Sequence, residues 1–172
     1  MGAQSIMGPF VQSREGAEKA VAATRYSPVV MRGMAGMTRA TRYGKVEDYF
    51  NTVDKEICLI VQLETIEALG RLEEIAAVEG VDGVFIGPLD LSASMSLAGQ
   101  TDHPKVRKAI TDAFQRWDAI GKPKGLMALD VNLAKGWIGA GSNFTAIGAD
   151  LDMIAQIAEI PLSELKFKQP LR

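Results

Sequence analysis

Residues 81–94 read VDGVFIGPLDLSAS, and residues 57–64 read ICLIVQLE. Each stretch contains a short apolar run rich in β-forming residues, and a carboxylate follows that run, Asp90 in the first stretch and Glu64 in the second. A helix-like segment separates the two. Successive parallel strands of an alternating β/α chain deliver such residues to the same end of the sheet. The two stretches therefore predict an α/β fold in which Glu64 and Asp90 meet.

Two carboxylates beside a Gly-Pro turn indicate a site for a hard divalent cation and an anion. Only oxygen ligands are offered, which favours Mg²⁺ or Mn²⁺ over zinc, and Co²⁺ could substitute. The turn at Gly87 and Pro88 lets backbone N–H groups point at an anion. Alone, Asp90 could simply cap its turn and Glu64 could be a solvated strand-end residue. The apolar run before Glu64 favours metal binding because an unpaired buried charge is costly.

The bulk composition describes a globular chain of one domain. The 172 residues are 47% hydrophobic, and 19 basic side chains nearly balance 21 acidic ones, so nucleic acid is not an expected partner. No apolar run is long enough to span a membrane, and the first residues lack the basic start and apolar core typical of a signal peptide, so a membrane is not an expected partner either. The single cysteine, Cys58, lies in an apolar strand pattern and is interpreted as a core residue. It also fits a reducing compartment, and a cytoplasmic location is expected.

The apolar periodicity alternates between short β-like runs and longer helical runs. Five strands are predicted, at Gln4–Val11, Ile57–Leu63, Gly83–Ile86, Gly125–Leu129 and Phe144–Ile147. Helices are predicted at Arg14–Arg25, Val46–Val53, Ile66–Val78, Pro104–Ile120, Val131–Ile138 and from about Leu151 onward. Two of these helices have side chains suited to cap their N-termini, Ser13 and Thr65.

Repeated βα units of about 30 residues indicate either a (β/α)₈ barrel or a doubly wound sheet. The glycine-rich dinucleotide and phosphate fingerprints do not follow any predicted strand. Functional groups placed after several different strands favour the barrel. A complete barrel usually needs about 250 residues, so the predicted fold is an incomplete (β/α)₈ TIM barrel of about five βα units.

Four motifs, in order along most of the chain, give it a resemblance to the HpcH/HpaI aldolase family of metal-dependent, class II pyruvate aldolases. They are residues 2–13 (GAQSIMGPFVQS), residues 20–33 (AVAATRYSP followed by RG), residues 59–65 (LIVQLET) and residues 79–94 (EGVDGVFIGPLDLSAS), the last followed by the HP at 103–104.

The resemblance implies a role for particular residues. Glu64 and Asp90 match the two metal-binding carboxylates of the family. Gln62 matches a glutamine that lines the site, and the backbone N–H groups of Leu89 and Asp90 match those that hold the pyruvate carboxylate. Met127 matches an apolar residue near the substrate. A 2-keto acid could then chelate Mg²⁺ or Mn²⁺, and the metal would stabilise the enolate that forms when the C3–C4 bond breaks.

The chain departs from the family pattern at its beginning. Its first motif corresponds to the family's fourth strand, so residues 1–172 are expected to form a single partial barrel domain that lacks the three N-terminal βα units. The family's general acid/base histidine and its pyruvate-binding arginine have no counterpart, and no catalytic residue is assigned. The only histidine, His103, matches a peripheral position.

The parent reaction implied by the resemblance is the reversible cleavage of a 4-hydroxy-2-oxo acid into pyruvate and an aldehyde. The acid is expected to be of the 4-hydroxy-2-oxoheptanedioate or 2-keto-3-deoxy sugar acid type. A citramalyl-type lyase, a non-catalytic remnant that binds metal or pyruvate or associates with homologues, and a purely structural module are the alternatives. A homo-oligomer is expected.

Two groups of basic residues admit other interpretations. Four arginines lie in or beside the long loop at 27–44. We expect them to contact a neighbouring subunit or the surrounding helices rather than the substrate. They are Arg25, Arg32, Arg39 and Arg42. Three lysines could suggest a Schiff base, but none is predicted to end a strand in an apolar pocket: Lys45, Lys122 and Lys124.

Overall fold

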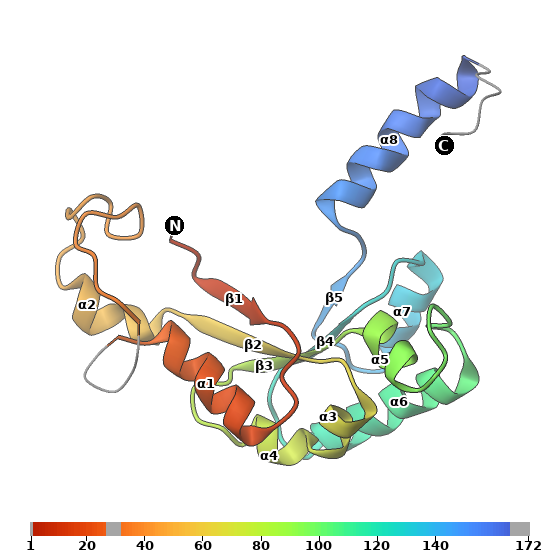
Figure 1. Ribbon diagram of the computed structural model, residues 1–172, viewed down its shortest axis with the longest axis horizontal. Coiled ribbons are helices and arrows are strands. Elements are labelled where there is room, and N and C mark those ends of the chain that lie inside the picture. Colours follow the sequence, from red (N-terminus) through yellow and green to blue (C-terminus); the bar gives the residue numbers. More distant parts are fainter. Residues whose placement is uncertain (1, 27–31, 166–172) are drawn as a thin grey trace.

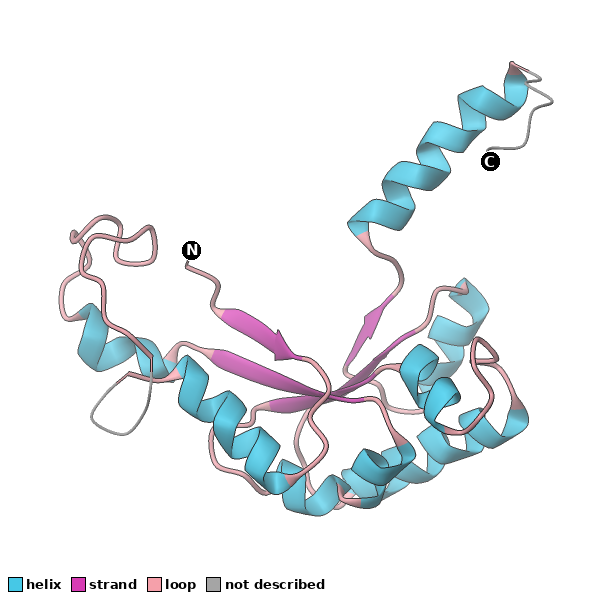
Figure 2. Cartoon of the chain, in the orientation of Figure 1, coloured by secondary structure: helices cyan, strands magenta, loops and turns pink. Residues whose placement is uncertain are grey.

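A computed structural model describes residues 2–26 and 32–165. Its five strands form one parallel sheet in the order β1-β2-β3-β4-β5, which is also their order along the chain. The sheet curls, and helices cover its convex face as in part of a barrel (Figures 1 and 2). The predicted incomplete (β/α)₈ architecture is confirmed. The strands are β1 (Ser5–Gly8), β2 (Cys58–Leu63), β3 (Gly83–Ile86), β4 (Lys124–Met127) and β5 (Phe144–Ala146).

Helices follow every strand of the sheet. They are α1 (Arg14–Thr24), α2 (Tyr49–Thr52), the 3₁₀ helix η1 (Val53–Lys55), α3 (Ile66–Gly70), α4 (Leu72–Ala76), α5 (Pro88–Ser94), α6 (Pro104–Asp118), α7 (Val131–Gly139) and α8 (Asp150–Glu164). The two predicted N-caps are present: Ser13 Oγ accepts a hydrogen bond from the N–H of Gly16, and Thr65 Oγ1 accepts one from Ala68. These local sequence signals therefore fix where α1 and α3 begin.

Several element boundaries differ from the prediction. The first strand ends at Gly8, before Pro9, which has no N–H to donate to a neighbouring strand, and before Phe10, whose φ is +56°. The helix predicted over Ile66–Val78 is divided at Arg71 into α3 and α4. The segment after β3, where a turn was predicted at Gly87 and Pro88, forms the short helix α5. Part of the long loop, residues 27–31, lies outside the described residues.

The core lies between the convex face of the sheet and the helices. Strand β2 alternates, so that Leu59, Val61 and Leu63 are at most 1% exposed while the residues between them face the concave side. The concave side also has packing of its own, because the ring of Phe144 stacks on that of Phe85 at 6.1 Å. Side chains on this concave face, at the carboxyl ends of the strands, are therefore the ones free to form a site.

The final helix, α8, leads away from the sheet (Figure 1). Its apolar side chains are exposed, with Leu151 at 75% and Ile157 at 67%. In the part of the chain that the structure describes, none of the helices combines the length and apolar character needed to cross a membrane.

Candidate functional site

The carboxyl ends of β2 and β3 bring together the residues that the sequence singled out. Leu63 pairs with Ile86 in the parallel register, so Glu64 and Gly87, one position further along each strand, lie next to each other. The N–H of Gly87 donates to the carbonyl of Leu63 at 3.3 Å, which extends the pairing to this point. Strand register therefore places the carboxylate of Glu64 against the turn that leads to Asp90.

Glu64 is 6% exposed, and hydrogen bonds orient its carboxylate from two sides. Oε2 accepts the backbone N–H of Phe10 at 2.9 Å, and Oε1 accepts Nε2 of Gln62 at 2.6 Å. Phe10 makes its bond from the left-handed conformation that bulky residues rarely adopt. A carboxylate has about four lone-pair positions, so the two bonds leave acceptor capacity for a further ligand.

The pKa of Glu64 lies above its usual value. Burial is the main cause of the increase, the N–H of Phe10 opposes it, and the neighbouring carboxylate of Asp90 raises the pKa further. Asp90 therefore lies close enough to Glu64 to influence its pKa. Two neighbouring negative charges repel each other, and a cation between them would relieve that repulsion.

Asp90 is exposed in the first turn of α5. The first N–H groups of a helix have no acceptor within the helix, and Pro88 has no N–H, so the N–H groups of Leu89 and Asp90 are available to a ligand. Leu91 and Ser92, both 0% exposed, anchor the helix beneath this turn. Their burial fixes the first turn of α5 relative to the sheet.

Gly87 leaves no room for a side chain. A Cβ built at this position would lie 2.6 Å from Oε1 of Glu64 and 3.0 Å from Nε2 of Gln62. The hydrogen-bonded pair of Gln62 and Glu64 therefore occupies the space that any other residue at position 87 would need. The sequence predicted a turn here but not this close approach.

Met127 ends β4 and is 36% exposed. It borders a cavity of about 300 Å³ that Pro88 and Leu89 also line. The substrate-binding residues predicted from the sequence thus fall into two groups. Gln62 and Asp90 interact with Glu64, whereas Leu89 and Met127 line the cavity.

The donor chemistry of the site fits a hard cation. Its ligands would be carboxylate oxygens of Glu64 and Asp90, and oxygen donors suit Mg²⁺ or Mn²⁺. Among the described residues, no cluster of three or more His, Cys, Asp or Glu side chains could hold a metal. Substrate and water would therefore have to supply the remaining ligands, as at a catalytic metal site.

The lysines and the histidine lie away from this site. Lys124 begins β4, at the opposite end of the strand, where it is 4% exposed, donates to the carbonyl of Phe114 at 3.1 Å and pairs with Asp118. Lys122 donates to backbone carbonyls after α4, including that of Val81 at 2.6 Å. His103 precedes α6, and its Nδ1 accepts the N–H of Lys105 at 3.2 Å.

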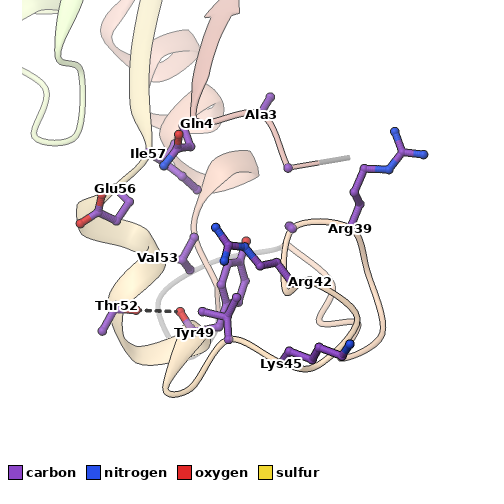
Figure 3. A pocket seen from close by; sticks show the side chains of 13 residues that line it. Ala3, Gln4, Arg39, Arg42, Lys45, Tyr49, Thr52, Val53, Glu56 and Ile57 are labelled. Carbon is purple, nitrogen blue, oxygen red and sulfur yellow. Dashed lines mark hydrogen bonds between the residues drawn. The ribbon is translucent and has the colours of Figure 1, made fainter.

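A second cavity, of about 810 Å³, lies at the amino ends of β1 and β2 and contains none of the predicted site residues. Arg39, Arg42 and Lys45 project from one loop beside it (Figure 3). The other two arginines of this region contact their own chain, Arg25 at the carbonyl of Ile57 and Arg32 at the carbonyl of Thr24.

Comparisons with known proteins identify the family to which the chain is similar. The family model described as HpcH/HpaI aldolase/citrate lyase matches residues 1–156. A pyruvate aldolase of Rhizobium etli is 50% identical over 159 residues, which cover 92% of this chain and 63% of that protein. A 4-hydroxy-2-oxo-heptane-1,7-dioate aldolase of Klebsiella pneumoniae is 44% identical over 160 residues, covering 92% and 60%.

A solved structure of a member of this family has a similar fold. The crystal structure of an HpcH/HpaI aldolase/citrate lyase family protein from Burkholderia cenocepacia has a TM-score of 0.86 and 33% identity to this chain, and the match covers 96% of this chain and 66% of that one. The chain spans about 60% of the length of the curated relatives it matches.

Proposed function

The chain belongs to the HpcH/HpaI aldolase/citrate lyase family, and from this premise we propose that it carries the metal- and pyruvate-binding part of a class II pyruvate aldolase. The observation that supports this most directly is the meeting of the buried Glu64 with Asp90 beside the open first turn of α5. The family membership confirms the resemblance seen in the sequence.

The proposed reaction is the reversible cleavage of a 4-hydroxy-2-oxo acid. The C3–C4 bond breaks, the C4 hydroxyl loses its proton to become the aldehyde carbonyl, and the electron pair passes to C3, which is then protonated as the methyl group of pyruvate. A bound Mg²⁺ or Mn²⁺, or Co²⁺ in its place, supplies a Lewis acid for the 2-keto group.

The residues of the chain would bind and orient the substrate. Glu64 and Asp90 would hold the cation, and Gln62 keeps the carboxylate of Glu64 in one orientation through its 2.6 Å hydrogen bond. The N–H groups of Leu89 and Asp90 would receive the pyruvate carboxylate, since both belong to the first turn of α5. Met127 would form an apolar wall beside the reacting carbon.

A second candidate function is a non-catalytic remnant that binds metal and pyruvate without turnover. The position of the single histidine favours it: His103 lies at the start of α6 and uses Nδ1 to accept the N–H of Lys105. A citramalyl-type lyase would use the same cation and carboxylate site with another electrophile, and only substrate tests separate it from the aldolase.

The experiment that tests the proposal is exchange of the pyruvate methyl protons for deuterium, followed by NMR with added Mn²⁺ or Mg²⁺. Mn²⁺ binding is measured in parallel by electron paramagnetic resonance. Exchange that needs metal and disappears in Glu64→Gln and Asp90→Asn supports the aldolase. Glu67→Gln is the matched control, because Glu67 is a nearby but exposed carboxylate in the first turn of α3.

Each other outcome has a definite meaning. Mn²⁺ and pyruvate binding without exchange supports the remnant. Wild-type protein that is folded but binds neither Mn²⁺ nor pyruvate contradicts both candidates and favours a structural module.

We also propose that the chain forms a homo-oligomer. The apolar side chains of α8 support this, because a helix that exposes Ile154, Ile157 and Ile160 at more than half of their surface has area to bury against another chain. Sedimentation velocity tests it: a purely monomeric species at micromolar concentration would contradict the proposal.

A further inference from the structure

The cavity of about 300 Å³ lies where α5, α6, α7 and the end of β4 meet. Leu89, whose N–H is part of the proposed pyruvate site, lines it. Met127, which follows the pairing of Leu126 with Ile86 and so lies beside the turn at Gly87, lines it too. Ile110 of α6 together with Leu133 and Trp137 of α7 form the opposite side. A molecule held at the pyruvate site would therefore have this cavity directly beside it.

The side of the cavity opposite Leu89 and Met127 is formed by side chains of the helices α6 and α7 rather than by a loop. Ile110 is 1% exposed, and Trp137 packs against the core with its ring 5.5 Å from that of Phe114. Asp130 caps α7 by accepting the N–H groups of Asn132 and Leu133, both at 2.9 Å. Such a wall keeps its shape before a ligand arrives, as is typical of small-molecule sites.

The chemistry of the lining favours an uncharged group. The charged side chains around the cavity are Asp102, Asp130 and Arg107. One guanidinium against two carboxylates provides no net positive charge to receive an anion. Moving a carboxylate from water into surroundings of this kind is costly. The size of the cavity is suitable for a hydrocarbon group, because an apolar cavity of about 150 Å³ already holds benzene.

We propose that this cavity binds the uncharged, apolar tail of the aldehyde, so that the substrates are aldehydes with aromatic or longer aliphatic groups rather than a second carboxylate. This inference rests on the proposed function, since pyruvate beside Leu89 is what directs the aldehyde toward the cavity. Leu133 and Trp137 then determine which tails are accepted.

Trp137 provides a direct test. The chain has two tryptophans, and Trp117 is 2% exposed in the core, so Trp117→Phe leaves Trp137 as the only tryptophan and as a reporter of the cavity. Two unreactive probes are titrated into this protein with Mn²⁺ and pyruvate present: 1-hexanol and the carboxylated 5-hydroxypentanoate. We expect a saturable change in the fluorescence emission of Trp137 with 1-hexanol. The protein should bind 1-hexanol about tenfold more tightly than 5-hydroxypentanoate.

A pair of variants localises the effect. Leu133→Phe adds volume inside the cavity and should abolish the response to 1-hexanol. Ile138→Phe makes a similar addition on α7 at a residue that is 57% exposed and does not line the cavity, and it should leave the response unchanged. Circular dichroism checks that both variants fold, and the comparison of the two probes in the parent protein stands without them.

The outcomes separate this inference from the function on which it rests. Binding of Mn²⁺ and pyruvate without a response to 1-hexanol, or with equal responses to the two probes, overturns the inference alone. A response to 1-hexanol in protein that binds neither Mn²⁺ nor pyruvate overturns both.

Discussion

Gly87 and Glu64 occupy adjoining positions so closely that a Cβ on residue 87 would lie 2.6 Å from Oε1 of Glu64 and 2.9 Å from its Cγ. The two residues belong to neighbouring strand ends and are brought together by the parallel register of β2 and β3. Because residue 87 has no side chain, the carboxylate of Glu64 can stay where its hydrogen bonds to Phe10 and Gln62 hold it.

The first prediction concerns this contact. Gly87→Ala should displace the carboxylate of Glu64 and lower the affinity for Mn²⁺ at least about tenfold, while the helices remain folded. Isothermal titration with Mn²⁺ measures the affinity. Gly70→Ala is the control, because nothing lies within 4 Å of a Cβ at that position. Equal Mn²⁺ affinity in the two variants would show that Glu64 is not a ligand.

The second prediction concerns the left-handed backbone at Phe10. A non-glycine residue in this conformation costs about 1–2 kcal/mol. Phe10→Gly keeps the N–H that binds Glu64 and relieves that cost, so the free energy of unfolding should change by less than about 1 kcal/mol, since glycine also loses more entropy on folding.

Phe10→Val is the matched variant, because a β-branched side chain disfavours positive φ most strongly. It should move the N–H away from Glu64 and weaken Mn²⁺ binding several-fold, which electron paramagnetic resonance would detect. The idea that this N–H orients Glu64 fails if Phe10→Val binds Mn²⁺ as tightly as Phe10→Gly.

The third prediction compares two glycines by thermal unfolding. A Cβ at Gly125 would lie 2.3 Å from the carbonyl oxygen of Phe144 in the neighbouring strand. Gly125→Ala should therefore destabilise the sheet by about 1–3 kcal/mol or more. Gly136 lies within α7 with nothing within 4 Å of a Cβ, and Gly136→Ala should stabilise by about 0.5–1 kcal/mol. A similar loss of stability in both variants would contradict the packing described at Phe144.

The fourth prediction is a pH dependence at Cys58. Burial raises the pKa of this thiol, the charge of Asp82 raises it further, and Arg25 opposes the increase. Because the thiolate is the reactive form, a raised pKa moves the rise in alkylation rate to higher pH than for a free cysteine. The rate of reaction with iodoacetamide, followed by mass spectrometry from pH 7 to 10, should show this displacement. A midpoint below that of glutathione would contradict it.

The sequence predicted the parts of the molecule that depend on local pattern. The strand over Gly83–Ile86 was placed at its observed limits, and the caps Ser13 and Thr65 begin helices as expected. The placement of Glu64 and Asp90 after the carboxyl ends of two neighbouring strands followed from the rule that parallel strands share one carboxyl end, and their role as metal ligands stays a prediction. The proximity of Gln62 to Glu64 follows as well, since residues two apart in a strand face the same side.

Other features have no local signature. The bond from Phe10 to Glu64 joins residues 54 positions apart, and only the assembled sheet brings them within 2.9 Å. Helix α5 was missed because its seven residues are too few to show a helical period, and tertiary burial of Leu91 and Ser92 stabilises it instead. The cavity beside Met127 depends on the packing of three helices, which no stretch of sequence encodes alone.

The strands lie in the sheet in the same order as they occur along the chain, and this order affects how the sheet can form during synthesis. Each strand from β2 to β5 pairs with the one made just before it, so as the chain leaves the ribosome each of these βα units finds its partner already exposed. The sheet can therefore grow co-translationally in one direction, from β1 toward β5. In this order of assembly Glu64 is synthesised after Phe10 and before Asp90, and its carboxylate can be oriented before the second carboxylate arrives.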